Sequence, residues 1–231
     1  MTFPDKHPVV LGTVTTPAGL KYLSRAKLPC HAVEVRVDAL LAKNTPAMEI
    51  EKALRRKKQP VLLTLRIPAE GGQLAWKVVE RRALFLRLLP LVEAIDVELA
   101  TARVMAPVLA AAKRAGKAVI LSAHAIEKPA TQAQFSRWVK LGDTLQPTVL
   151  KIAARIKSWH DLQHLAALLV NFPGRAIAAM GLGPYAAQSR SVLAALGSRL
   201  VYGYLDEPAA PGQPSAAAAA KMVQVVRDLN E

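Results

Sequence analysis

The chain has 231 residues, of which 52% are hydrophobic and 21% are charged, so it can bury a large core and does not have the composition of a disordered protein. Cys30 is its one cysteine, which excludes an intrachain disulfide and a cysteine-based metal site. The formal net charge of +14 is dispersed, with no basic tail and no aromatic-and-glycine RNA-binding motif, so we expect no nucleic-acid partner.

The apolar segments of the chain are short. None reaches the roughly 18 residues of a membrane span. Residues 1–6 lack the charged-then-apolar order of a signal peptide. The sequence therefore predicts a cytoplasmic protein that does not enter a membrane.

Apolar runs typical of buried strands alternate with amphipathic helical runs along the whole chain. This order predicts a parallel sheet, and eight repeats in a chain close to the typical barrel length of about 250 residues favour an α/β (β/α)8 TIM barrel over an open sheet. No linker interrupts the pattern, so residues 1–231 are predicted to form a single domain. The candidate strands are 9–13, 31–37, 61–65, 94–99, 118–122, 148–152, 176–180 and 200–204, and the longest helical stretches are 74–91 and 215–229.

Capping residues and glycines mark where the predicted helices begin and end. Thr45, which precedes a proline, is expected to cap the helix after the second strand. Thr101 and Ser158 are expected to cap the helices after the fourth and sixth strands. Gly116 and Gly174 are expected to reverse the chain direction.

Lys151 lies at the centre of the apolar strand-like run 148–154. Burying an ammonium group is costly unless the group is paired or loses its proton. An amine that loses its proton can attack a carbonyl carbon and form an imine. The alternative is a lysine that pairs with a carboxylate or extends from the end of its strand.

Several polar residues lie close to the carboxyl ends of predicted strands, the face that carries the active site in barrel enzymes. Glu34 and Arg36 are two residues apart, so both point to the same side of the second strand. Facing into a barrel, such charges are costly to bury unless they pair or bind a ligand. Any one of these residues could be structural, but their convergence on one face predicts a binding site. The polar residues in question are Glu34, Arg36, Arg66, Glu70, His124, Lys151 and Arg190.

Two other patterns do not indicate a ligand site. His160 and His164 have the spacing of a zinc-binding pair, but no glutamate follows His160 and no third ligand is evident, so no metal is expected. The Gly181-Leu182-Gly183 segment is too short to identify a phosphate-binding loop, and we interpret it as a flexible turn.

Segments spread over almost the entire chain resemble the type I 3-dehydroquinate dehydratases of the shikimate pathway. Each segment alone is a weak signal, whereas eight in family order are specific. The segments are 34–38, 65–66 with 70–72, 95–99, 122–124, 150–153, 180–181 with 189–190, 197–198 and 210–213.

The resemblance implies a hydro-lyase reaction without a cofactor. In this reaction 3-dehydroquinate, a small carboxylate, loses water by syn elimination through a lysine imine and gives 3-dehydroshikimate. Lys151 is similar to the family's Schiff-base lysine. His124 is similar to its general acid/base, with Glu70 as the partner that orients the ring.

The resemblance also implies which residues bind the substrate. Arg190 would hold the substrate carboxylate, and Gln213 would close over the substrate from the loop after the last strand. Glu34, Arg36 and Arg66 would contact its hydroxyl groups. Family members are usually dimers, so a homodimer is expected.

Two other functions remain open at this point. The same buried lysine would serve another imine-forming barrel lyase, such as a class I aldolase. A barrel that has lost catalysis and gained a binding role is also possible. It is suggested by the charge and by two alanines, Ala125 and Ala209, where the family pattern has aspartate and serine.

Overall fold

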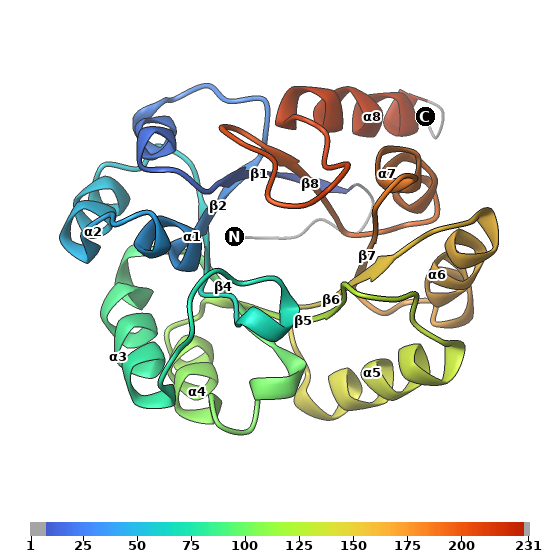
Figure 1. Ribbon diagram of the computed structural model, residues 1–231, viewed down its shortest axis with the longest axis horizontal. Coiled ribbons are helices and arrows are strands. Elements are labelled where there is room, and N and C mark those ends of the chain that lie inside the picture. Colours follow the sequence, from blue (N-terminus) through green and yellow to red (C-terminus); the bar gives the residue numbers. More distant parts are fainter. Residues whose placement is uncertain (1–7, 229–231) are drawn as a thin grey trace.

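The computed structural model describes residues 8–228, which form a barrel of parallel strands surrounded by helices (Figure 1). The strands pair in the order β7-β6-β5-β4-β3-β2-β1-β8, and every pairing is parallel. Beside β7, the backbone N–H of Arg199 donates to Ile177 O at 2.9 Å, so the barrel is nearly closed. The predicted (β/α)8 fold is confirmed. The strands are β1 (Val9–Val14), β2 (Ala32–Arg36), β3 (Val61–Thr64), β4 (Ala94–Glu98), β5 (Ala118–Ala125), β6 (Val149–Arg155), β7 (Ile177–Leu182) and β8 (Leu200–Tyr204).

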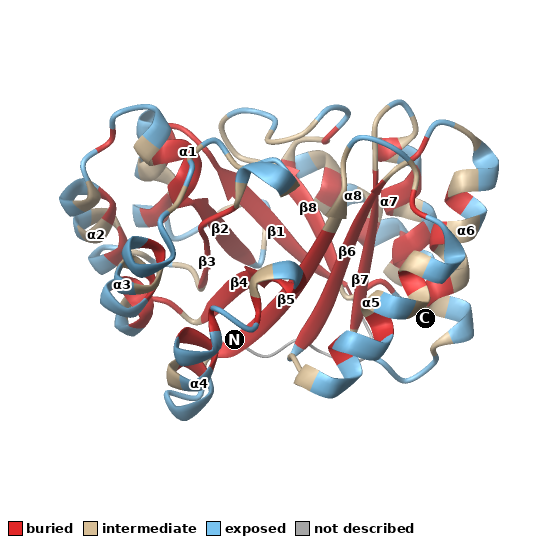
Figure 2. Cartoon of the chain, turned by 60° about the horizontal axis from the view of Figure 1, so that its bottom comes forward, coloured by how far each residue is buried: buried red, intermediate tan, exposed pale blue. Residues whose placement is uncertain are grey.

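The helices form the outer layer of the barrel, with their buried sides against the strands and their exposed sides facing solvent (Figure 2). In the described part of the chain, no helix has the length and apolar character needed to cross a membrane. Short 3-10 segments η1 (Pro17–Ser24), η2 (Pro68–Glu70), η3 (Leu89–Leu91) and η4 (Leu99–Thr101) connect several elements. The helices are α1 (Val37–Ala42), α2 (Ala47–Arg55), α3 (Val78–Leu88), α4 (Ala106–Arg114), α5 (Gln132–Leu145), α6 (Trp159–Asn171), α7 (Ala186–Ala195) and α8 (Ala216–Asp228).

The inside of the barrel changes character along the strands. Because side chains alternate between the two faces of a strand, every second residue points inward. Near the amino ends of the strands these inward residues are apolar and pack into one cluster, whose members include Val9, Leu11, Ala32, Leu62, Ala94, Ile120, Val149, Ala178 and Leu200. At the next inward positions the buried residues are mostly polar, and include Thr13, Glu34, Thr64, Asp96, Ser122 and Lys151. The apolar cluster therefore fills the barrel at the amino ends of the strands. The polar residues face a space nearer the carboxyl ends.

Several strands continue further than the sequence pattern predicts, β5 and β6 the furthest. β5 and β6 each run three residues beyond their expected ends at 122 and 152. They extend because they pair with one another, with His124 opposite Ala153 and Ala125 opposite Ala154. His124 therefore lies within a strand, where ladder hydrogen bonds hold its backbone in place.

One of the three predicted helix caps is confirmed and two are wrong. The Ser158 hydroxyl and the Asp161 carboxylate form a reciprocal capping box at the start of α6. Thr45 is no cap, because α2 begins at Ala47 and the buried Thr45 hydroxyl has no hydrogen-bond partner among the described residues. Thr101 lies in η4 before α4 begins, and its hydroxyl donates to the Glu98 carboxylate at 3.1 Å.

The two longest helical stretches are shorter than predicted. α3 begins at Val78 and not at residue 74, because Trp76 is held in the preceding loop by a hydrogen bond from its ring nitrogen to Arg66 O at 3.1 Å. α8 covers residues 216–228, and residue 229 lies outside the described part of the chain. Gly116 and Gly174 have φ of 64° and 78°, which confirms the predicted chain reversals.

Candidate active site

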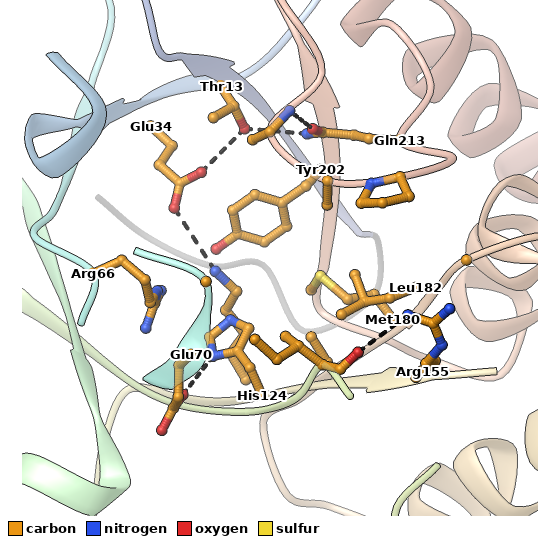
Figure 3. A pocket seen from close by; sticks show the side chains of 18 of the residues that line it. Thr13, Glu34, Arg66, Glu70, His124, Arg155, Met180, Leu182, Tyr202 and Gln213 are labelled. Atoms are coloured by element: carbon orange, nitrogen blue, oxygen red, sulfur yellow. Dashed lines mark hydrogen bonds and ion pairs between the residues drawn. The ribbon is translucent and has the colours of Figure 1, made fainter. Parts of the chain in front are cut away.

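A cavity of about 360 Å³ opens at the carboxyl ends of the strands (Figure 3). Side chains from both ends of the sequence meet there, because the barrel brings the ends of all its strands to one face. The structure brings together all of the site residues predicted from the sequence. Those that line this cavity are Glu34, Arg36, Arg66, Glu70, His124, Lys151, Arg190 and Gln213.

Lys151 projects from the middle of β6 and is 4% exposed. Its Nζ is 3.0 Å from Asp96 Oδ2 and 3.7 Å from Glu34 Oε1, so the buried lysine is paired with carboxylates, as one of the two sequence interpretations allowed. Nζ also lies 4.2 Å from the centre of the Tyr202 ring. The pairing does not remove the lysine from the cavity, which it still lines. A nucleophile and an ion-paired ammonium are therefore two protonation states of one group.

Asp96 connects Lys151 to Arg66. Arg66 Nη2 is 2.8 Å from Asp96 Oδ2, and its Nη1 is 3.2 Å from Glu98 Oε1. Ser122 accepts from Arg66 at 2.6 Å and donates to Asp96 at 2.6 Å. Burial alone would raise the pKa of the Asp96 carboxyl, but the charges of Arg66 and Lys151 hold it well below its usual range. The sequence predicted Arg66 as a substrate contact, whereas in the structure its charge is balanced by two buried carboxylates.

Glu34 and Arg36 share a face of β2 but do not pair with each other. Glu34 accepts hydrogen bonds from the Thr13 hydroxyl at 3.0 Å and the Thr64 hydroxyl at 2.9 Å. Arg36 forms two hydrogen bonds with Asp38, at 2.9 Å from Nε and 2.7 Å from Nη2. This two-point pairing satisfies the guanidinium and fixes its direction. Both side chains still line the cavity, where a ligand's hydroxyl groups could reach them.

His124 and Glu70 form a close pair at the edge of the cavity. His124 Nδ1 and Glu70 Oε2 are 2.6 Å apart, which leaves the other ring nitrogen free for a ligand (Figure 3). Burial raises the pKa of Glu70 to about 8. Burial lowers the pKa of His124 well below its usual value, and the charges of Arg66 and Lys151 lower it further. Near neutral pH the ring is therefore uncharged, and it can act as a base through its other nitrogen when Glu70 is ionised and accepts from Nδ1.

Arg190 differs from Arg36 and Arg66 in lacking a carboxylate partner. It lies in α7, is 3% exposed, and donates only to backbone carbonyls, including Tyr202 O at 3.0 Å and Ala186 O at 2.6 Å. No acidic residue in the described part of the chain forms an ion pair with it. Burial without a counter-ion lowers the pKa of Arg190 to about 10. A buried cation in this state favours an anionic ligand.

Gln213 lies on the loop between β8 and α8, which covers one side of the cavity. Its side-chain oxygen accepts from Ala209 N at 2.7 Å, and its nitrogen donates weakly to the Thr13 hydroxyl at 3.4 Å. The loop is shaped by Gly212, whose φ is 74° and whose added Cβ would lie 2.6 Å from Gly183 O. The glycine thus allows the loop to pack closely against the β7–α7 connection.

Some residues of the site were not identified from the sequence, among them Tyr202 and Arg155, which line the cavity, and Asp96, which pairs with Lys151. Asp96 lies at an inward-facing position of β4, within the segment 95–99 that resembles the family. Tyr202 lines the cavity from β8, and Arg155 lines it from the last position of β6, four residues after Lys151. The signal for all three was strand alternation, since each falls on the face that points into the barrel.

His160 and His164 lie away from this cavity. They pack with their ring centres 4.2 Å apart on α6. Among the residues that the structure describes, no group of three or more histidine, cysteine, aspartate or glutamate residues could hold a metal ion.

Sequence and structure comparisons agree on one group of proteins. The model of the type I 3-dehydroquinase family matches residues 9–230. The 3-dehydroquinate dehydratase of Methanosarcina acetivorans is 31% identical over 191 residues, which cover 78% of this chain and 79% of that protein. The 3-dehydroquinate dehydratase of Methanocella arvoryzae is 30% identical over 213 residues, covering 90% of this chain and 92% of that protein.

A solved structure shares the same fold. The type I 3-dehydroquinate dehydratase of Clostridium difficile, determined with covalently modified comenic acid, superposes with a TM-score of 0.87. The superposition covers 99% of this chain and 96% of that chain at 22% sequence identity. At this identity the superposition supports the barrel fold and does not by itself carry over a function.

Proposed function

Because the chain belongs to the type I 3-dehydroquinase family, as the resemblance in its sequence predicts, we propose that it converts 3-dehydroquinate to 3-dehydroshikimate through a lysine imine. One observation carries the proposal. The buried amine of Lys151 lines the same cavity as the His124–Glu70 pair and as Arg190, the cation without a counter-ion. An amine, an acid/base and an anion-binding group are what an imine-forming dehydratase of a carboxylate needs.

Substrate binding begins at Arg190. A carboxylate supplies the negative charge that this guanidinium does not find among the described residues, and a charge-assisted hydrogen bond is stronger than a neutral one. Binding there orients the ring of the substrate toward Lys151 across the cavity. Glu34 and Arg36, which are already held by their own partners, then meet the substrate's hydroxyl groups as rigid contacts.

Imine formation joins Lys151 to the ketone carbon of the substrate. The amine nitrogen forms a bond to that carbon, the carbonyl oxygen becomes a hydroxyl, and the hydroxyl leaves as water. In sum, an ammonium and a ketone give an iminium and one water molecule, so the positive charge stays on the nitrogen. Asp96 and Glu34, at 3.0 Å and 3.7 Å from Nζ, stabilise that charge both before and after the reaction.

Elimination then uses the iminium as an electron sink. The iminium acidifies the neighbouring C–H bond, so an uncharged imidazole can take the proton. His124 acts through its free ring nitrogen when Glu70 is ionised, because the carboxylate then accepts a hydrogen bond from Nδ1 and stabilises the imidazolium that forms. His124 returns the proton to the departing hydroxyl group, which leaves as water, and a second water hydrolyses the imine and frees Lys151.

Product absorbance tests the reaction class directly. Adding 3-dehydroquinate to the purified protein should produce the absorbance of a conjugated enone, and Lys151→Met should abolish it. Borohydride added with substrate should leave a reduced adduct on the peptide that contains Lys151. A class I aldolase would instead release a carbon–carbon cleavage product, and a binding protein would produce neither signal. An adduct on another lysine, such as the nearby Lys157, would refute the proposal.

We also propose that the protein is a homodimer, because the family to which it belongs is usually dimeric. Light scattering on the purified protein should give twice the chain mass of 24.8 kDa. A monomer at concentrations at which the protein is active would refute this part of the proposal.

A further inference from the structure

Tyr202 occupies the centre of the cavity and has no assigned part in the reaction. It lies on β8, is 4% exposed and lines the cavity. Figure 3 shows its ring projecting into the cavity, with the hydroxyl directed to the side on which Glu34 and Arg66 lie. Among the residues that the structure describes, the buried hydroxyl oxygen has no hydrogen-bond partner.

An unpaired buried hydroxyl costs free energy that a phenylalanine at the same place would not cost. The other buried cavity atom without a partner is Arg155 Nε, but the guanidinium of Arg155 still donates from Nη1 to Ile126 O at 3.3 Å. The Tyr202 hydroxyl has no such second contact. Its missing partner is therefore to be sought in the molecule that fills the cavity.

The position of the Tyr202 ring relative to Lys151 shows which part of a ligand reaches the Tyr202 hydroxyl. Lys151 Nζ lies 4.2 Å from the centre of the ring. A carbon atom bonded to Nζ must therefore lie beside the same ring, and the oxygen carried by that carbon comes within reach of the ring's polar end. The ring face also favours a positive charge on the nitrogen.

The hydroxyl is a hydrogen-bond donor at every pH of interest. Burial raises the pKa of Tyr202 well above its usual value, and the negative charges of Glu34 and Asp96 add to the effect. The oxygen thus keeps its proton and offers it to an acceptor without transferring it.

We propose that Tyr202 is a further catalytic residue, whose hydroxyl donates a hydrogen bond to the oxygen on the carbon that Lys151 attacks. This inference rests on the proposed imine mechanism. As the N–C bond forms, the π electron pair of the carbonyl moves onto that oxygen, so the hydrogen bond strengthens toward the transition state. The oxygen takes up the two protons that the ammonium gives up and leaves as water, while Tyr202 keeps its own proton throughout.

Tyr202→Phe separates this role from a structural one, because it keeps the ring and removes only the hydroxyl. The variant should unfold at the same or a higher temperature than the wild type, since an unpaired buried group is lost. The rate of imine formation should nevertheless fall by about ten- to a hundredfold. To measure the rate, the protein is mixed with 3-dehydroquinate and quenched with borohydride at increasing times. Mass spectrometry of the peptide that contains Lys151 then gives the fraction that carries the adduct.

Introducing the same change into a His124→Ala protein isolates imine formation from proton abstraction, and the fall in trapping rate should persist there. Tyr204→Phe is the matched control, because it removes a hydroxyl from the same strand outside the cavity lining, and its imine should be trapped at the wild-type rate.

Three outcomes would overturn the inference. Trapping of Tyr202→Phe at the wild-type rate overturns this inference and leaves the proposed function standing. Loss of thermal stability together with activity overturns it in favour of a packing role. Absence of any adduct in the wild type overturns both proposals, since Lys151 would then form no bond to a carbon of the substrate.

Discussion

The two sides of the cavity satisfy their charges in different ways. On the side formed by β3, β4 and β6, Arg66, Asp96 and Lys151 belong to an ionic network that also includes Glu98. On the side formed by α7 and β8, Arg190 bonds, among the described residues, only to backbone carbonyls. Tyr202, which faces the same space, has a hydroxyl with no partner in that part of the chain. We call these the paired side and the open side.

The difference indicates how the work is divided between the two sides. Groups on the paired side are held in position before any ligand arrives, which is the preorganisation that electrostatic catalysis requires. Groups on the open side lack partners that only a ligand can supply, so their interactions form only with the substrate. Arg190 would hold its carboxylate, and Tyr202 would donate to the oxygen on the attacked carbon. Substitutions on the paired side should therefore lower stability or turnover. Those on the open side should leave stability nearly unchanged and weaken the interactions with the substrate.

The largest effect is expected from His124→Ala, at the border of the paired side. Removing a general acid/base typically costs about 10²–10⁴-fold in turnover. The lysine can still attack the ketone, so borohydride should still trap an adduct on Lys151 in steady state. Turnover close to the wild-type value would show that another group moves the proton. It would contradict the assignment of proton transfer to this side.

The contrast between Arg66→Met and Arg190→Met tests the comparison most directly. Arg66→Met removes one of the cations that balance Asp96 and Glu98, which retain Lys151 and Arg81 as partners, and should lower the free energy of unfolding by about 3–5 kcal/mol. Arg190→Met removes a charge that has no counter-ion, so stability should fall much less, while KM should rise by roughly 10- to 100-fold through loss of a charged hydrogen bond. Denaturant unfolding and steady-state kinetics on the same preparations provide both values. Equal stability losses would contradict the division into two sides.

A smaller, graded effect is expected with pH. Burial raises the pKa of Glu70 to about 8, so below that pH the carboxyl holds a proton that it can donate to His124 Nδ1, which leaves the free nitrogen protonated. Above that pH the carboxylate accepts from Nδ1–H, and the free nitrogen can act as a base. The kcat/KM should therefore rise with pH by up to about tenfold per unit and level off above about 8. In Glu70→Gln this rising limb should disappear, and its persistence would assign it to another group.

The smallest effects are expected from the loop between β8 and α8, which carries Ala209 and Gln213. Gln213→Ala should raise KM a few-fold and change kcat less, because one neutral hydrogen bond contributes about 0.5–1.5 kcal/mol. Ala209→Ser, which restores the residue of the family pattern, should leave kcat similar and improve kcat/KM at most a few-fold. Unchanged constants in Gln213→Ala would mean that residues 211–213 form only a structural turn.

Local sequence patterns were sufficient to predict the parts of the molecule that depend on neighbouring residues. The (β/α)8 order follows from alternating strand and helix patterns, and the Ser158 cap from the residues beside it. The caps expected at Thr45 and Thr101 failed. The Thr101 hydroxyl donates instead to the carboxylate of Glu98, which is held in place by Arg66 and Arg81 from other parts of the chain.

The sequence by itself determined the barrel and the candidate site residues, because strand periodicity decides which side chains face inward and the barrel brings all strand ends together. Only the tertiary structure decided which charges pair. Lys151 pairs with Asp96, 55 residues away, and Arg66 with Glu98, 32 residues away, while Arg190 has no counter-ion among the residues described. Such pairing depends on distances of a few ångströms between strands far apart in the chain. Burial, which raises the pKa of Glu70 and encloses the Tyr202 hydroxyl, likewise arises only when the whole barrel is packed.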